Sequence, residues 1–172
     1  IGGIFVSYKA VALFDLDKTL LNPEKQIPPE NLAALKALKD NHVLTVLSTG
    51  RNYYELADWM RLGQIPSAIA ANGADVYHNG QHLFESPVGL PQLQHLTQQA
   101  QADGLALAYY NGRRSALSQN TPETEANYQW VRQTPPPVDA KFFDHDDVCM
   151  LLIFLAHNAQ GDKMGDWYRQ AF

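Results

Sequence analysis

An apolar segment that leads directly into two closely spaced carboxylates constrains this chain more than any other feature. Val11-Ala12-Leu13-Phe14 is followed at once by Asp15-Leu16-Asp17-Lys18-Thr19. The apolar residues do not alternate with polar ones, which predicts a buried strand of a parallel sheet that is covered on both faces. Carboxylates at the C-terminal end of such a strand open into the crevice where α/β proteins bind ligands. The segment therefore predicts an α/β fold with a functional site after this strand.

The two carboxylates suggest metal-assisted chemistry. In an extended backbone, Asp15 and Asp17 point to one side and Leu16 points to the other. Two carboxylates this close repel each other unless a cation neutralises them, and Mg²⁺ prefers oxygen ligands and keeps waters that a phosphate can replace. One carboxylate can then attack phosphorus while the other transfers protons. Aspartates after a strand also start turns or cap helices, and this alternative stays open from the pair alone.

The first part of the chain alternates between helical and extended patterns. A helix is predicted from Pro28-Pro29 to Asp40, a strand over 43–47, a helix that ends near Gly63, and a strand over 65–71. This order predicts a Rossmann-like parallel sheet with right-handed crossovers.

Two further polar motifs follow the later strands of this part. Ser48-Thr49-Gly50-Arg51 is predicted to open a helix, where hydroxyl and backbone N–H groups can hold a phosphate. A simple helix N-cap explains Ser48 or Thr49 equally well. Asn72-Gly73-Ala74 follows the strand over 65–71 and is read either as a plain turn or as a segment close to the site.

Together these motifs resemble those of the haloacid dehalogenase (HAD) superfamily, and in particular its Cof-type phosphatases. The resemblance implies that Asp15 is the nucleophile, that Asp17 is the general acid and base, and that both bind Mg²⁺, Asp17 through its backbone carbonyl. Lys18 stands where the superfamily commonly has glycine. That departure weakens the assignment to a subfamily more than the assignment of the chemistry.

The resemblance also assigns roles to the second motif and to the turn after the third strand. It implies that Thr49 hydrogen-bonds the transferred phosphoryl group and that Leu16 and Gly50 add backbone contacts. Arg51 and Asn72 are expected to lie near the substrate, which would be a small phosphate ester.

The second part of the chain has a different pattern and is expected to form a separate domain. A hairpin is predicted around Asn79-Gly80. Strands are predicted over 105–110, 113–118 and 148–156, and helices over 91–103, 123–133 and 161–172. This α+β order matches the cap of Cof-type phosphatases. We therefore divide the chain into a core part, residues 1–75, and a cap, residues 76–172.

Part of the superfamily's machinery is not evident. Gly161-Asp162-Lys163-Met164-Gly165-Asp166 has the letters of the fourth motif, but it is interpreted as the start of a cap helix because the chain ends six residues later. No lysine matching the third motif is evident before it. The chain is therefore interpreted as a fragment of a longer phosphatase, or else as a shortened relative with weak activity. A half-sheet would leave an exposed strand edge that invites self-association.

Two functional hypotheses from different classes follow. The first is a Mg²⁺-dependent phosphatase that acts on a small phosphorylated metabolite, such as a sugar phosphate, through a phosphorylated Asp15. The second is a non-catalytic binding or assembly module that keeps the fold but not the complete site.

Composition excludes other partners and suggests a compartment. The net charge is −5 and no run of Lys or Arg occurs, which argues against nucleic acid and anionic membranes as partners. The apolar runs are too short to cross a bilayer, and no secretory signal pattern is evident at the N-terminus. The single cysteine, Cys149, is expected to be a buried thiol, and the cytoplasm is the expected location.

Three other polar groups are interpreted as ordinary structure. His78 and His82 flank a turn, so their spacing does not favour a metal site. The acidic segment 144–147 is expected to be a solvated loop, and the Arg113-Arg114 pair is expected to be surface charge near a hairpin tip.

Overall fold

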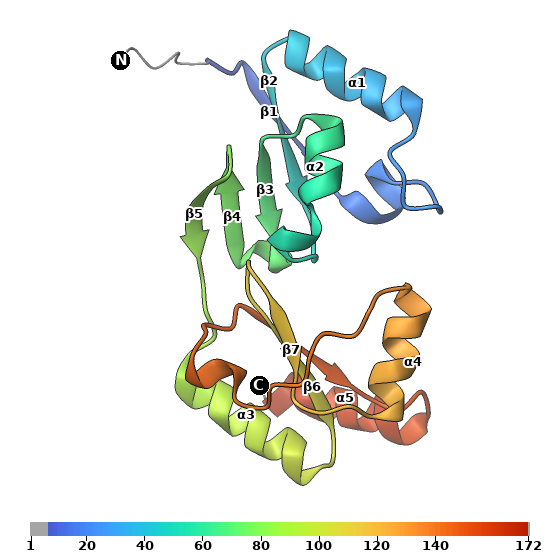
Figure 1. Ribbon diagram of the computed structural model, residues 1–172, viewed down its shortest axis with the longest axis vertical. Coiled ribbons are helices and arrows are strands. Elements are labelled where there is room, and N and C mark those ends of the chain that lie inside the picture. Colours follow the sequence, from blue (N-terminus) through green and yellow to red (C-terminus); the bar gives the residue numbers. More distant parts are fainter. Residues whose placement is uncertain (1–6, 172) are drawn as a thin grey trace. The chain divides into compact units, whose positions relative to one another are not determined.

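A computed structural model describes residues 7–171 of the protein, which form two compact units (Figure 1). The first unit reaches Ser86 and the second begins at Pro87, and each contains its own β-sheet. The hairpin that the sequence assigned to the cap belongs instead to the first unit, because its strands continue the first sheet. The predicted boundary after residue 75 therefore falls inside the first unit.

The first unit contains a five-stranded sheet in the order β1-β2-β3-β4-β5. β1 (Ala10–Phe14), β2 (Val43–Ser48) and β3 (Ser67–Ala70) are parallel, whereas β4 (Asp75–His78) and β5 (Gln81–Glu85) form an antiparallel hairpin at the β3 edge. Phe14 pairs with Leu47, and Ser48 pairs with Ile69. The C-terminal ends of the parallel strands consequently lie side by side. The predicted Rossmann-like α/β fold is confirmed.

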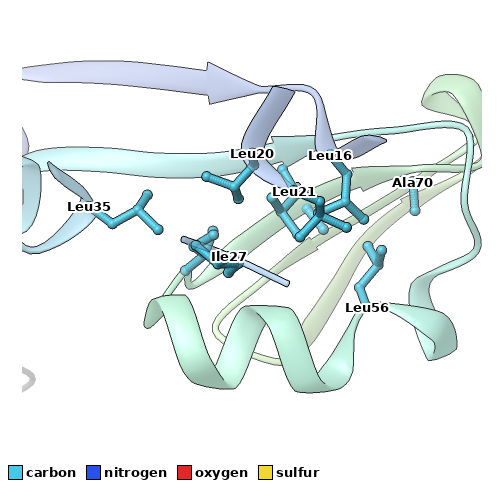
Figure 2. Packing of buried hydrophobic residues seen from close by; sticks show 10 residues of the cluster. Leu16, Leu20, Leu21, Ile27, Leu35, Leu56 and Ala70 are labelled. Atoms are coloured by element: carbon cyan, nitrogen blue, oxygen red, sulfur yellow. The ribbon is translucent and has the colours of Figure 1, made fainter. Parts of the chain in front are cut away.

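The helices of the first unit bury one face of this sheet. α1 (Pro29–Asp40) begins at the second proline of the Pro28-Pro29 pair, and α2 (Ala57–Gly63) follows a short 3-10 turn at Tyr53–Glu55. Figure 2 shows part of the core that they form with the strands. Its buried members are Leu16, Leu20, Leu21, Ile27, Leu35, Leu47, Leu56, Ile65, Ala68 and Ala70.

β1 is an edge strand among the described residues, so the prediction that it is buried is wrong for this part of the chain. It pairs only with β2. Phe14 packs against the core, whereas Val11 and Leu13 alternate to the other face and are 56% and 57% exposed. The apolar run has the composition of a central parallel strand, but within residues 7–171 no element covers its second face.

The second unit is an α+β domain, as predicted. Its antiparallel sheet has the order β7-β6-β8 and buries hydrophobic clusters that include Tyr109 and Phe142 on one side and Tyr128 and Phe154 on the other. Its elements are α3 (Leu90–Ala102), β6 (Ala106–Tyr110), β7 (Ser115–Leu117), α4 (Pro122–Val131), β8 (Met150–Phe154) and α5 (Ala159–Ala171).

The Gly161-to-Asp166 segment lies within α5, in agreement with its interpretation as part of a helix. A Cβ atom on Gly161 would lie 1.9 Å from the backbone oxygen of Ala156, so glycine is required for the close approach of α5 to the chain after β8. Gly165 faces Leu155 one turn later. Close packing accounts for both glycines without a metal site.

Two smaller expectations can also be compared with the structure. Cys149 is a buried free thiol, as expected. None of the helices within residues 7–171 has the length and apolar character needed to cross a membrane.

Replacing Leu47 by alanine should destabilise the first unit strongly. Leu47, on β2, is fully buried in the core of the first unit, so Leu47→Ala should lower the free energy of unfolding by about 2–5 kcal/mol. Leu62→Ala is the matched control, because Leu62 on α2 is 52% exposed and should change it by less than about 0.5 kcal/mol. Urea unfolding followed by far-UV circular dichroism measures both. Equal losses would contradict the described core.

Candidate functional site

The loop after β1 turns its two carboxylates away from the core. Asp15 (φ −67°, ψ 150°) and Asp17 (φ −78°, ψ 126°) have extended backbones, and Leu16 between them is fully buried. The Leu20 N–H donates to the Asp15 carbonyl at 3.2 Å and closes the loop. Asp15 is exposed and Asp17 is partly exposed, which is the alternation predicted from the sequence. Because Leu16 fills the core with its side chain, only its backbone can reach a ligand.

The backbone at Lys18 explains why glycine suits this position. Lys18 has a φ of 62°, in the left-handed region that costs most residues roughly 1 kcal/mol or more. The turn at Lys18 lets Thr19 fold back on the first carboxylate, and the Thr19 hydroxyl donates to Asp15 Oδ2 at 3.3 Å. Lys18 therefore adopts the loop conformation that glycine would adopt, but its backbone is strained.

The loop after β2 is joined to the loop after β3 by backbone hydrogen bonds. The Thr49 N–H donates to the Ile69 carbonyl at 3.0 Å, the Asn72 N–H to the Thr49 carbonyl at 3.2 Å, and the Ala71 N–H to the Arg51 carbonyl at 2.8 Å. The Arg51 N–H donates to Thr49 Oγ1 at 3.2 Å. These bonds fix the 7%-exposed Thr49 side chain at the end of β2.

The Ser48-to-Arg51 motif does not open a helix, and that prediction is wrong. The next turn begins at Tyr53 and α2 only at Ala57. The physical reason is the set of hydrogen bonds just described, which commit the motif's backbone to the neighbouring loop. A phosphate at this position would therefore be bound by a loop and not by the N-terminus of a regular helix.

Gly50 and Asn72 are in close contact. A Cβ atom at position 50 would lie 2.9 Å from Asn72 Oδ1, so a side chain there would displace the Asn72 side chain. Asn72 itself has a left-handed backbone, with φ 55°. The structure thus places Asn72 beside the second motif, where the sequence expected it near the site.

An ion pair connects the first loop to the second. Arg51 Nε lies 2.8 Å from Asp17 Oδ2, and Arg51 Nη2 lies 3.0 Å from Asp17 Oδ1. Lys25 Nζ is 2.5 Å from the same Asp17 Oδ1. The bidentate hydrogen bonds from Arg51, helped by Lys25, outweigh partial burial and lower the pKa of Asp17 to about 2. The same contact raises the pKa of Arg51.

Trp59 and Lys25 belong to this arrangement, although the sequence analysis missed both. The Arg51 Cζ atom lies 5.0 Å from the centroid of the Trp59 ring, a cation–π contact. The Trp59 Nε1–H donates to the Lys25 carbonyl at 3.0 Å. Trp59 therefore contacts the guanidinium of Arg51 and the backbone of Lys25, the two residues that hold Asp17. Its position in a helical apolar stripe gave no signal of this contact, and Lys25 is an unremarkable residue of a polar loop.

The donor set suits a hard cation but is incomplete among the described residues. Asp15 and Asp17 supply carboxylate oxygens, and Mg²⁺ is commonly bound by one or two carboxylates, with waters and phosphate completing its shell. Within residues 7–171, no group of three or more Asp, Glu, His or Cys side chains gathers into a metal cluster. The residues present therefore fit Mg²⁺ as a partial ligand set.

The two histidines near the β4–β5 turn are engaged separately. His82 Nε2 lies 2.7 Å from Oδ1 of Asp75, a carboxyl that is 1% exposed and whose pKa is raised by burial. His78 Nδ1 lies 2.7 Å from Ser67 Oγ. The two histidines therefore have different polar partners.

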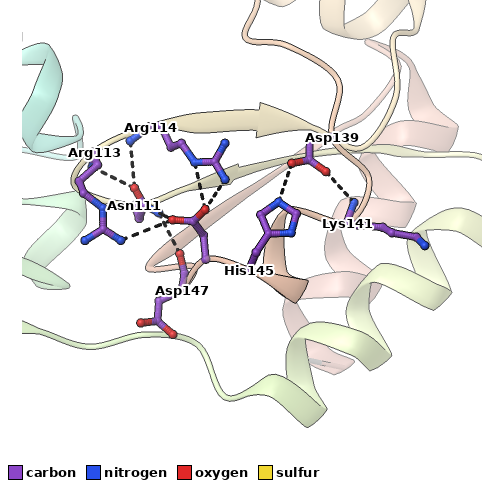
Figure 3. Close-up of polar contacts among 8 residues, drawn as sticks. Asn111, Arg113, Arg114, Asp139, Lys141, His145 and Asp147 are labelled. Carbon is purple, nitrogen blue, oxygen red and sulfur yellow. Dashed lines mark hydrogen bonds and ion pairs between the residues drawn. The ribbon is translucent and has the colours of Figure 1, made fainter.

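The arginine pair of the second unit is tied to the acidic segment near residue 146 (Figure 3). Arg114 Nε donates to Asp146 Oδ2 at 3.0 Å, and Arg113 Nη2 lies 3.4 Å from Asp146 Oδ1. Buried Asn111 accepts both arginine backbone N–H groups and donates to Asp146 and to the Asp147 carbonyl. Asp146 is therefore an internal ion-pair partner and not part of a fully solvated loop.

Comparison with known proteins gives a family match and local similarity to phosphatases. Residues 12–172 match the family model described as haloacid dehalogenase-like hydrolase. An HMP-PP phosphatase of Serratia proteamaculans is 40% identical over 75 residues, which cover 42% of this chain and 27% of that protein. A 5-amino-6-(5-phospho-D-ribitylamino)uracil phosphatase of Bacillus subtilis is 37% identical over 83 residues, 46% of this chain and 32% of that protein. Both matches span less than a third of the relative.

Solved structures show the same fold over nearly the whole chain. A protein from Geobacillus kaustophilus superposes with a TM-score of 0.83 at 25% identity and covers 94% of this chain and 63% of its own. The sugar phosphatase BT4131 gives a TM-score of 0.71 at 19% identity, with coverage of 91% and 61%. The latter similarity shows the fold alone.

The ion pair between the two loops predicts a specific change in titration. Arg51→Gln should raise the pKa of Asp17 from about 2 toward its ordinary value of 3.8. Because the lowered pKa favours the folded state above about pH 4, the stability that wild type loses between about pH 4 and 2 should shrink in the variant. Side-chain ¹³C NMR of Asp17 against pH measures the first effect. Arg61→Gln, which removes the exposed partner of Asp58, should leave the Asp17 titration unchanged.

Proposed function

We propose, from the premise that this chain belongs to the haloacid dehalogenase-like hydrolase family, that it forms the nucleophile-bearing part of a Mg²⁺-dependent phosphatase. Its substrate would be a small phosphorylated metabolite, such as a sugar phosphate. The observation that supports this best is the Asp17–Arg51 ion pair, which joins the carboxylate loop after β1 to the Thr49 loop after β2. The phosphatases to which the chain is locally similar support the same class of reaction.

The proposed reaction proceeds through a phosphorylated aspartate. An Asp15 carboxylate oxygen attacks phosphorus, the bond from phosphorus to the ester oxygen breaks, and Asp17, which must be in its protonated form for this step, gives its proton to the leaving oxygen. Asp17 then takes a proton from water, which attacks the phosphorylated Asp15 and releases inorganic phosphate. Thr49 would donate its hydroxyl hydrogen to a phosphoryl oxygen, with backbone contacts from Leu16 and Gly50.

Mg²⁺ would be held by Asp15 and by Asp17, the latter through its backbone carbonyl, and would supply electrostatic stabilisation of the phosphoryl oxygens. The protein's own part is positioning: buried Leu16 fixes the direction of both aspartates, and backbone hydrogen bonds to the loop after β3 fix the second loop. Asn72 and Arg51 would line the approach of the substrate.

These residues by themselves are expected to be a weak catalyst. Phosphate-monoester hydrolysis is among the slowest uncatalysed reactions, and its catalysts supply roughly 20 kcal/mol through positioning and electrostatics. The described residues offer only a partial Mg²⁺ ligand set, and the chain spans 63% of the Geobacillus kaustophilus protein. We propose that further charged groups, outside the residues described, complete the site of the active enzyme.

Substitution of the nucleophile should remove activity. Asp15→Asn should lower kcat at least a thousandfold toward small phosphate monoesters in the presence of Mg²⁺, because no phosphorylated enzyme can form. The release of inorganic phosphate from a panel of sugar phosphates and pyrimidine phosphates measures this, in the longest natural form of the protein. Asp58→Asn, an exposed change of the same kind, should retain activity. Full activity in Asp15→Asn would rule out the proposed mechanism.

A second candidate function is assembly through β1, either as the role of a non-catalytic module or beside catalysis. Within residues 7–171 β1 pairs only with β2, and Val11 and Leu13 are exposed. Both observations favour assembly, since an unpaired apolar edge strand pairs readily with another strand. We propose that a second copy pairs with this edge when only these 172 residues are present.

A charge on β1 should prevent this self-association. Leu13→Lys should convert a concentration-dependent dimer of the 172-residue chain into a monomer, because edge lysines oppose strand pairing. Light scattering after size-exclusion chromatography measures the mass. Leu62→Lys, on an exposed position of α2, is the matched control and should remain dimeric. A monomeric wild type at all concentrations would exclude the assembly function.

A further inference from the structure

We propose that Arg51 is a substrate-binding residue that exchanges partners: it binds Asp17 while the site is empty, and it moves to the phosphoryl group when that group enters at the Thr49–Gly50 loop. The inference deepens the proposed function and rests on it, since it takes this loop as the phosphoryl site.

The two ends of Arg51 tie it to both partners. Its backbone N–H donates to Thr49 Oγ1 at 3.2 Å, so the residue is anchored in the proposed phosphoryl loop. Its guanidinium reaches across to Asp17 with Nε and Nη2 at 2.8 and 3.0 Å. A phosphoryl group offers two oxygens with the spacing that suits the same planar fork. Carboxylate and phosphoryl oxygens would therefore compete for the same two donors.

Lys25 lowers the energetic cost of this exchange for Asp17. Its ammonium group lies 2.5 Å from Asp17 Oδ1 and is contributed by a different segment of the chain from Arg51. When Arg51 moves away, Lys25 still neutralises the Asp17 carboxylate. The exchange therefore leaves no unpaired charge at a partly buried position. A carboxylate with a single cation would resist the loss of its partner more strongly.

Trp59 contacts the guanidinium of Arg51 and anchors the backbone of Lys25. The guanidinium of Arg51 lies over its ring at 5.0 Å, and its indole N–H donates to the Lys25 carbonyl. A guanidinium can slide across an aromatic face without losing the attraction completely. Trp59 also supplies a spectroscopic signal, because its emission depends on the charge above the ring.

The functional consequence is a coupling between substrate binding and the state of Asp17. In the empty site, Asp17 has two cationic partners and is held away from proton transfer. A bound phosphoryl group would gain the guanidinium of Arg51 as a cationic partner. Asp17 would lose that partner and could then face the leaving oxygen. The same arginine would thus contribute to binding and to the timing of catalysis.

The alternative is that Arg51 is a static brace between the two loops. Asp17→Asn distinguishes the two roles, because it weakens the ion pair and frees Arg51. If Arg51 moves to phosphate, freeing it should tighten phosphate binding. Removal of a negative charge alone would also tighten binding, but it would do so whether or not Arg51 is present.

The experiment is a double-mutant cycle with inorganic phosphate as the probe, in EDTA to exclude metal. Trp130→Phe and Trp167→Phe leave Trp59 as the only tryptophan, and its emission is followed during titration. Asp17→Asn should tighten phosphate binding about fivefold, the size expected for one partly exposed ion pair. In an Arg51→Gln background the same change should tighten binding clearly less, because only the loss of negative charge then remains. Asp58→Asn, which breaks the Arg61 pair on α2, controls for net charge and should leave binding unchanged.

The outcomes separate the inference from the proposed function. Tightening by Asp17→Asn of equal size with and without Arg51 would overturn the exchange while leaving the phosphate site standing. No binding to any variant, or binding that Thr49→Ala leaves intact, would overturn the phosphoryl loop and the inference with it. Arg51→Lys provides a folded comparison that keeps the charge but not the fork, and it should bind phosphate more weakly than wild type.

Discussion

The parallel pairing of β1 with β2 is the constraint on which the candidate site depends. Because Phe14 is level with Leu47, the chain leaves both strands at the same edge of the sheet, and the Asp17 and Arg51 side chains meet there. A register shift of one residue would turn Leu16 toward solvent and both aspartates toward the core. The strand register that buries Leu16 in the core is therefore the same register that turns both aspartates toward the site.

Much of the fold could be predicted because local patterns and the core agree. The alternation of strand and helix up to residue 71, the turn at Asn79-Gly80 and the apolar stripes of the second unit each carry a local signal that packing reinforces. The exposure of β1 could not be predicted from its own composition, which reports the cover that a strand is suited to and not the cover that it has. Only the half-sheet pattern predicted an exposed strand edge, and it did not say which strand. The helix expected at Ser48 failed because hydrogen bonds to the β3 loop, which are non-local, took up the backbone.

The residues of the candidate site also divide into those that the sequence could indicate and those that it could not. Asp15, Asp17 and Thr49 stand in motifs whose spacing is visible in the sequence, and Gly50 has a steric reason that the contact with Asn72 now supplies. Lys25 and Trp59 stand in no motif. They reach Asp17 and Arg51 only because the loop before α1 folds back beside α2, and a contact between segments 34 residues apart leaves no periodic trace in the sequence.

The charges around Asp17 bear on how such a site can bind an anion at all. Asp15 and Asp17 would repel a phosphate dianion, and in the structure the two nearby cations, Arg51 and Lys25, are already committed to Asp17. Binding must therefore bring new positive charge or redistribute what is present. Mg²⁺ at the aspartates would bring new positive charge, and the exchange of Arg51 would redistribute the charge that is present. Since the exchange moves charge that the fold has already placed, it needs no additional group, and it is favourable only when an anion has arrived at the Thr49 loop.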